Sequence, residues 1–247
     1  MTDTTARFAE SPFRIGAVLS RTSSVLSRNL LIFFVVTVVA NLPGTLLLKN
    51  ATDAAAADPG RAGGMIFLGS FLTLVLSTLS QAVVLYGAFQ DMRGRKVDLG
   101  ESLKVGLSRL LAIIGLAILM SLGIGFGFVL LIIPGLILIT MWFVATPACV
   151  VERLGPFRSM GRSSQLTKGH RWKILGLFLI LAIGGAIVSG IVEAILGMFG
   201  IVLALIGGLI WNGIWGAFYA IAVVVTYHDL RVAKEGVDIE HIASVFD

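Results

Sequence analysis

The chain contains a run of 42 residues, between Arg109 and Glu152, in which no side chain carries a charge. A helix needs about 20 residues, at 1.5 Å each, to cross a hydrocarbon layer about 30 Å thick, so this run is long enough for two passes. Soluble proteins, with about a quarter of their residues charged, rarely contain such a run. The run therefore predicts a transmembrane hairpin, with its turn between residues 124 and 134, where Gly and Pro gather.

Similar runs occur on both sides of this one. Residues 174–228 form a stretch of 55 residues with one charge, Glu193, and two further apolar blocks precede residue 90. With 57% hydrophobic and 13% charged residues, the 247-residue chain predicts a single all-α membrane domain, residues 1–247, and excludes a large soluble catalytic domain. The six transmembrane helices that we predict are residues 30–48, 65–89, 108–126, 132–151, 174–196 and 201–227.

Lys and Arg are distributed unevenly between the two ends of these spans. The amino-terminal segment, the loops 90–109 and 151–173 and the tail hold 17 of the 19 basic residues, and only Lys49 and Arg61 lie in the remaining loops. The positive-inside rule therefore predicts a multi-pass protein with both termini in the cytoplasm. Residues 1–28 carry four arginines and no apolar stretch typical of a signal peptide, so we expect the first apolar block to be an anchor.

A basic or amphipathic segment precedes each odd-numbered span. In residues 13–28 apolar side chains recur at helical spacing, while Arg7, Arg14, Arg21 and Arg28 recur every seven residues on another face. Residues 99–110 and 156–173 have related patterns. We therefore predict three hairpins, each preceded by an amphipathic interfacial helix, in a parallel pseudo-threefold repeat. The alternative is that basic inner loops are common to all multi-span proteins.

Small residues recur at every fourth position of the sixth span. They are Gly200, Ala204, Gly208, Gly216 and Ala220, with Asn212 at the centre. Such a stripe lets another helix approach closely, so we expect packing within the chain, with Asn212 bonding across the contact. Expected partner faces are Ala182, Ala186 and Gly190 in the fifth span, and Gly123 and Gly127 in the third. The alternative is a homo-oligomer that associates through these small-residue faces.

Few polar side chains lie inside the spans, and the intramembrane candidates are Asn41, Gln81, Glu193 and Asn212. An intramembrane carboxylate is a functional candidate by default. Glu193 follows Lys173 by 20 residues, roughly 30 Å along a helix, so we expect it at the outer interface in contact with water. A polar or ion-linked site is the alternative. Convergence of these four residues on one cavity would favour transport, whereas their dispersal among packed contacts would favour a structural role.

No arrangement typical of a catalytic or metal site occurs in the sequence. The single Cys149 has no partner for a disulfide and is expected to be buried. His228-Asp229 is a weak metal or acid–base signal that lacks further ligands, and we interpret it as a helix cap and interface anchor. We therefore expect no enzymatic activity, no catalytic residue, no bound metal and no cofactor.

Basic residues on the predicted cytoplasmic side form the largest charged cluster. Without the tail from His228 onward, this side has 15 Lys and Arg against six acids. Each basic residue near an anionic leaflet contributes about 1 kcal/mol, so we predict membrane lipids, anionic phospholipid above all, as partners, and no nucleic acid. The candidates for binding lipid headgroups, with Trp172 as an aromatic anchor, are Arg14, Arg21, Arg28, Arg158, Arg162, Lys168, Arg171, Trp172 and Lys173.

Several short motifs, mostly in the carboxy-terminal half, resemble those of a known family. They are Ile133-Pro134-Gly135-Leu136, residues 142–147, Val151-Glu152, Gly155-Pro156, and residues 163–173, 227–231 and 234–236. The chain resembles, over most of its length, the prokaryotic family named after the membrane domain of glycerophosphoryl diester phosphodiesterases. It departs from that pattern at His228, where an aromatic residue is usual, and at Ala233, where a basic residue is usual.

The resemblance implies a location in the bacterial inner membrane and a link to phospholipid or glycerophosphodiester metabolism. It carries over no catalytic residue, because the phosphodiesterase chemistry belongs to a separate soluble barrel that this chain is too short to hold. Our leading hypothesis is a non-enzymatic protein that organises or senses phospholipid or partner proteins through its basic cytoplasmic face. The alternative is a small transporter, flippase-like protein or channel for a lipid-related solute.

Overall fold

A computed structural model describes residues 13–55 and 58–235, which are helical and contain no strand. The helices in these ranges are α1 (Ile15–Ala54), α2 (Pro59–Met92), α3 (Leu99–Leu130), α4 (Ile132–Trp142), α5 (Ala145–Val151), α6 (Pro156–Thr167), α7 (Arg171–Gly197) and α8 (Ile201–Glu235). Six segments of the described ranges are long and apolar enough to cross a membrane, α4 and α5 together forming one of them. The protein therefore has the all-helical architecture of a multi-pass membrane protein, as the sequence predicts.

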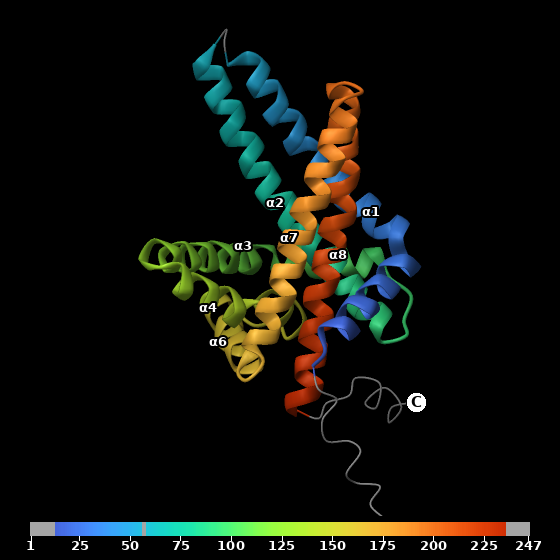
Figure 1. Ribbon diagram of the computed structural model, residues 1–247, viewed down its shortest axis with the longest axis vertical. Coiled ribbons are helices and arrows are strands. Elements are labelled where there is room, and N and C mark those ends of the chain that lie inside the picture. Colours follow the sequence, from blue (N-terminus) through green and yellow to red (C-terminus); the bar gives the residue numbers. More distant parts are fainter. Residues whose placement is uncertain (1–12, 56–57, 236–247) are drawn as a thin grey trace, which may run out of the picture.

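The helices pack as sequential pairs that differ in direction. α1 packs along α2, α3 along α4, and α7 along α8, while α8 also packs against α1. In Figure 1 the α1–α2 pair diverges from α7 and α8 toward the top of the view. The α3 and α4 helices lie across the direction of the other pairs. The three pairs are therefore not oriented alike, and their arrangement does not confirm a pseudo-threefold repeat, which stays a prediction.

Local chemistry explains where several helices begin and end. Asp58 and Asp98 cap α2 and α3, each accepting a hydrogen bond at 3.0 Å from the backbone N–H three residues later. α3 ends at Leu130 and α4 begins at Ile132, which places the turn inside the predicted range. Gly200, at a φ of 116°, lies in the turn between α7 and α8, where a residue without Cβ is favoured.

The fourth span is divided at Phe143–Val144, between α4 and α5. Pro147 has no N–H and cannot bond to the carbonyl of Phe143, so the helix is weakened there. Ser163 of α6 takes over part of the bonding, because its hydroxyl accepts from Val144 N at 3.2 Å and donates to Met141 O at 2.9 Å. The hydrogen bonds of Ser163 at this break hold α6 against the fourth span. The break itself was not among the predictions from the sequence.

The interfacial segments differ from the three separate helices that we predicted. Residues 15–28 begin α1, which departs from helical geometry at Asn29, and residues 99–110 begin α3 without a break. Asn29 is held by hydrogen bonds from its amide to Val25 O and to Asp91. The third segment, α6, is separate because Gly169, at a φ of 90°, turns the chain before α7. The predicted loop 50–64 is also mostly helical, since α1 extends to Ala54 and α2 begins at Pro59.

The core lies toward one end of the molecule. Residues 220–227 of α8 are all buried, together with residues 82–85 of α2 and Phe33 of α1. At Gly213 a Cβ would lie 2.8 Å from Cγ2 of Val38, so α1 and α8 touch at this level. Beyond Gly213, toward Gly200, the two helices diverge, and this divergence opens the space described next.

Candidate functional site

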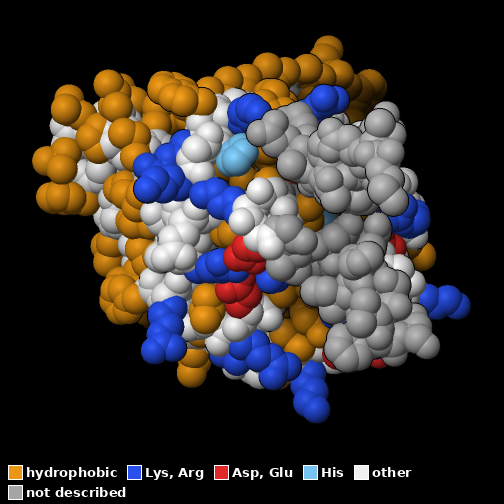
Figure 2. Space-filling view, turned by 90° about the horizontal axis from the view of Figure 1, so that it is seen from below, with side chains coloured by type: hydrophobic (Ala, Val, Ile, Leu, Met, Phe, Trp, Pro, Cys, Tyr) orange, Lys and Arg blue, Asp and Glu red, His pale blue; other side chains and the backbone are white. Residues whose placement is uncertain are grey.

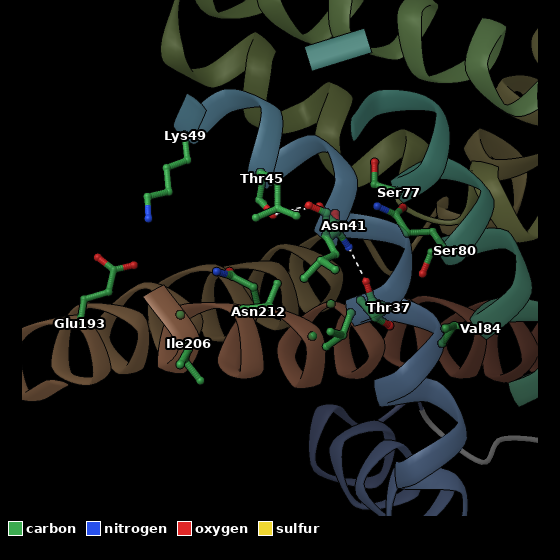
Figure 3. A pocket seen from close by; sticks show the side chains of 18 of the residues that line it. Thr37, Asn41, Thr45, Lys49, Ser77, Ser80, Val84, Glu193, Ile206 and Asn212 are labelled. Carbon is green, nitrogen blue, oxygen red and sulfur yellow. Dashed lines mark hydrogen bonds between the residues drawn. The ribbon is translucent and has the colours of Figure 1, made fainter. Parts of the chain in front are cut away.

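A cavity of about 890 Å³ lies between α1, α2, α7 and α8, on the side where the helix pairs diverge (Figure 3). All four intramembrane polar candidates line it, each from a different helix: Asn41 from α1, Gln81 from α2, Glu193 from α7 and Asn212 from α8. Its remaining wall is mostly apolar. The cavity thus brings together four candidates that lie up to 171 positions apart in the chain, from Asn41 to Asn212.

α1 contributes a polar stripe to the cavity wall. Thr37, Asn41, Thr45 and Lys49 recur every fourth residue and all line the cavity. The Asn41 amide donates to Thr37 O at 2.7 Å, and Thr45 Oγ1 donates to Leu42 O at 2.9 Å, which holds both side chains against the helix. From Thr37 to Lys49 the stripe is about 18 Å long, more than half of a hydrocarbon layer about 30 Å thick.

The small-residue stripe of α8 faces this stripe across the cavity. Gly208, Asn212 and Gly216 all line the cavity, and Figure 3 shows the Asn212 side chain extending from α8 toward α1. A Cβ at Gly208 would meet nothing within 4 Å, so this residue leaves space rather than contact. The predicted close packing at Gly208 and Asn212 is therefore wrong, because these positions line open space.

The neighbouring glycines of α8 provide the contacts instead. A Cβ at Gly207 would collide with Leu196 of α7, and one at Gly213 would collide with Val38 of α1. Of the predicted partner faces, Ala182, Ala186 and Gly190 are exposed, whereas Gly123 and Gly127 do pack, against Trp142 and Gly135 of α4. Whether the exposed face of α7 associates with a second copy stays a prediction.

The mouth of the cavity carries charge. Lys49 and Glu193 are both exposed, and Figure 3 shows their charged ends pointing toward one another from α1 and α7. Ser189, one turn away, donates to Glu193 at 3.4 Å. The sequence analysis singled out Glu193 but missed Lys49, whose signal was its place at the end of the four-residue polar spacing on α1.

Apolar packing closes the opposite end of the cavity. Val84, 1% exposed, forms part of the wall, and Phe33, fully buried, lies one helical turn below Thr37. A second cavity of about 270 Å³ lies between α2, α3, α4, α5, α7 and α8, and Gln81 lines both cavities. Side-chain packing therefore closes the larger cavity at the end next to Val84.

Basic residues gather on the face at the closed end, where Figure 2 shows them around a small acidic group, with apolar side chains at the rim. Three of the headgroup candidates form ion pairs within the protein: Arg21 with Asp229, Arg28 with Asp91, and Arg162 with both Glu152 and Glu235. His228-Asp229 does not end α8, which extends to Glu235, so its predicted role as a helix cap is wrong.

Glu152 is the centre of this acidic group. It accepts hydrogen bonds from Arg162 Nε at 2.9 Å and from the Tyr227 hydroxyl at 2.6 Å, and Arg231 lies 3.9 Å away. Burial opposes the charge on Arg162, but its hydrogen bonds to Glu152 and Glu235 prevail and raise its pKa. The cluster fastens α6 to α8, and the sequence analysis, which considered only the basic residues, missed the acids.

The other headgroup candidates remain on the surface. Arg14, Arg158, Lys168 and Lys173 are exposed, Trp172 is 85% exposed, and Arg171 is half-buried. Cys149 is fully buried, as predicted. Within the described ranges, no group of His, Cys, Asp or Glu has the arrangement of a metal site.

Comparisons with protein-family models, with curated proteins and with solved structures each gave no match. The cavity and the basic face are therefore the features of the molecule that bear on its function.

Proposed function

We propose that the protein is a small transporter or flippase-like protein of the bacterial cytoplasmic membrane, which binds a lipid-related amphiphile in the cavity between α1, α2, α7 and α8. In this proposal the basic face and both termini are cytoplasmic. One observation carries it: the four intramembrane polar candidates Asn41, Gln81, Glu193 and Asn212 come from four helices and line one cavity. Polar groups in a membrane are unfavourable unless they pair or face water, so their convergence supports a binding site.

The lining supports an amphiphilic ligand. Polar groups follow α1 and also occur on α2, α7 and α8, while apolar residues such as Leu42, Leu46 and Ile206 form most of the remaining wall. A mostly apolar cavity with a few oriented polar groups is typical of sites for small organic molecules, and a volume of about 890 Å³ lies within their usual range of roughly 300 to 1,000 Å³. A lipid-related molecule has this combination of a polar head and an apolar body.

Transport across the membrane requires the closed end of the cavity to open. That end depends on the contact between Gly213 and Val38 and on the packing of Phe33 and Val84. α1 contains two weak points on either side of this contact, the non-helical residue Asn29 and the internal Pro43. We propose that α1 bends at these two points when the cavity changes its access from one side to the other.

Proteoliposome flux of a fluorescent phospholipid analogue tests the proposal. Asn41→Leu and Asn212→Leu place apolar groups in the cavity, and we expect at least a tenfold loss of flux, since each removes a polar partner from an apolar site. Ser121→Leu, at an exposed position of α3 outside the cavity, is the matched control. Wild-type flux in both Asn variants would overturn the proposal.

The basic face favours a second candidate function, the sensing or organising of anionic phospholipid and the partner proteins bound to it. The exposed Trp172 beside Lys173, with Arg14, Arg158 and Lys168 also exposed, supports headgroup binding at the membrane surface. The resemblance to the phosphodiesterase membrane-domain family supports the same link to phospholipid, as a proposal.

Replacing Arg14, Lys168 and Lys173 by Gln tests this second function without breaking an internal ion pair. We expect less anionic phospholipid to be retained after purification, as measured by native mass spectrometry. Arg21→Gln is the contrasting variant, because Arg21 already pairs with Asp229. Lipid retention equal to that of the wild type in the triple variant would sink the idea.

A further inference from the structure

The cavity mouth presents one charge of each sign on opposite walls. Lys49 stands on α1 and Glu193 on α7, both exposed and directed toward one another (Figure 3). None of the ion pairs among the described residues joins Lys49 to Glu193, whereas several charged side chains on the basic face do form ion pairs. Both charged groups are therefore exposed and available to a third group.

Two charges of opposite sign select against ligands with a net charge. An anion near Lys49 would be repelled by Glu193, and a cation near Glu193 would be repelled by Lys49. An uncharged head would remove water from both charged groups without supplying an opposite charge to compensate for the lost hydration. A ligand that carries both charges satisfies both residues, because charge-assisted hydrogen bonds are about twice as strong as neutral ones.

The wall beneath the mouth is suited to a chain. Leu42 and Leu46 on α1 and Val202, Ile206 and Leu209 on α8 line the same cavity as the charged mouth and Asn212. Burying a methylene group against such a wall contributes about 0.8 kcal/mol, so an attached alkyl chain adds affinity that a bare headgroup lacks.

We propose, on the basis of the proposed binding function of the cavity, that its ligand is a zwitterionic amphiphile. Its anionic group, a phosphate or carboxylate, binds the Lys49 ammonium, its own ammonium binds the Glu193 carboxylate, and its alkyl chain lies along Leu42, Leu46 and Ile206. A phospholipid with an amine headgroup has this chemistry, and so does a free zwitterion without a chain. The apolar wall favours the source that bears the chain.

Binding of short-chain lipids to the purified full-length protein tests this inference. The probes are dihexanoyl phosphatidylethanolamine, which is zwitterionic, dihexanoyl phosphatidylglycerol, which is anionic, and glycerophosphoethanolamine, which has the zwitterionic head and no chains. The wild type should bind the zwitterionic lipid about tenfold more tightly than the anionic lipid, and should bind the chain-free probe much more weakly.

Charge variants at the mouth sharpen the test. Lys49→Gln should weaken binding of the zwitterionic lipid roughly five- to tenfold, and Glu193→Lys should reverse the preference toward the anionic lipid. Arg61→Gln and Asp53→Asn are matched controls, since these exposed residues lie near the same ends of α1 and α2 but outside the cavity wall, and both should bind like the wild type.

The outcomes separate this inference from the proposed function. Equal binding of the two lipids, both by the wild type and by Glu193→Lys, would overturn the proposal of a zwitterionic ligand. It would leave intact the proposal that the cavity binds an amphiphile. Equal binding of the chain-free probe and the zwitterionic lipid would overturn the role of the chain. If neither lipid binds the wild type, or if Asn212→Leu binds both like the wild type, the proposed function of the cavity itself fails.

Discussion

The two ends of the molecule differ in whether their polar groups bond to one another or face a cavity. At the basic end, Glu152 is bonded to Arg162 and Tyr227, and the surrounding segment of α8 is buried. At the other end, Asn41, Asn212 and Glu193 face a cavity. α8 thus runs from a packed, internally bonded end, at Tyr227, to an open end where Asn212 and the other polar groups face a cavity. Stability should depend mainly on the first and ligand binding on the second.

The largest expected effect comes from removing the carboxylate at the packed end. Glu152→Ala removes the acceptor of the Tyr227 hydroxyl proton, leaving this hydroxyl only the hydrogen bond that it accepts from Arg231 at 3.3 Å, and it leaves Arg162 with Glu235 as its acidic partner. We expect a loss of about 2 kcal/mol, or roughly 4 to 8 °C in Tm, because buried groups that lose their partners are destabilising. Thermal unfolding in detergent measures this loss.

Glu193→Gln at the open end is the control for that experiment. Its carboxylate is exposed and bonds to Ser189, so the change should alter Tm by no more than about 1 °C. Equal destabilisation by the two substitutions would contradict the division into a packed end and an open end.

Two glycines five positions apart on α8 provide the next comparison. Gly213→Ala places a Cβ 2.8 Å from Val38 and should destabilise the protein by about 1 to 2 kcal/mol, because α1 and α8 must move apart. Gly208→Ala meets nothing within 4 Å and should stabilise the helix by about 0.5 to 1 kcal/mol, because Ala loses less backbone entropy than Gly.

Both variants are measured by the same unfolding assay, together with binding of the lipid probe. Gly208→Ala should weaken binding about twofold or less, since it narrows the cavity without removing a polar group. Stabilisation by Gly213→Ala would show that α1 and α8 do not touch at this level.

The smallest expected effect concerns pH at the packed end. Burial lowers the pKa of His170, as do the neighbouring charges of Lys173 and Lys234, so folding favours the neutral ring, which packs edge-on against Phe13. The unfolded chain therefore binds a proton at a higher pH than the folded chain. The contribution of His170 is complete above about pH 6.5 and is lost as the pH falls below that value.

Measuring Tm between pH 7.5 and 5 checks this contribution. The wild type should lose about 2 °C more than His170→Gln over this interval, because Gln does not titrate. A steeper pH dependence in His170→Gln than in the wild type would contradict the assignment.

Much of the architecture could be predicted because charges are so unfavourable in a bilayer. The run between Arg109 and Glu152 predicts two spans on this ground alone, and the turn at Leu131 lies in the predicted interval. The same rule identified Asn41, Gln81, Glu193 and Asn212 as unusual. Hydropathy therefore determines which residues are exceptional, but it does not determine which helices bring them together.

The features that could not be predicted depend on which helix faces meet. Small residues recur at 208 and 216, on either side of Asn212, as well as at 207 and 213. Only tertiary packing decides that 207, 213 and 216 approach a neighbouring helix while 208 lines open space. The role of Lys49 depends on the opposite wall, and the pairing of Arg162 depends on Glu235, 73 residues later. The spacing of residues along the sequence does not show what lies opposite Lys49 or which acid pairs with Arg162.

Cysteine labelling in nanodiscs tests the central claim, a water-accessible cavity lined by the intramembrane polar residues, most directly. The wild type offers one thiol, Cys149, which is fully buried and serves as an internal reference. Asn212→Cys should react with a membrane-impermeant maleimide at least about tenfold faster than Ala222→Cys, which lies on the same helix but is buried, since only a hydrated thiol ionises readily. Equally slow labelling at positions 212 and 222 would contradict the cavity.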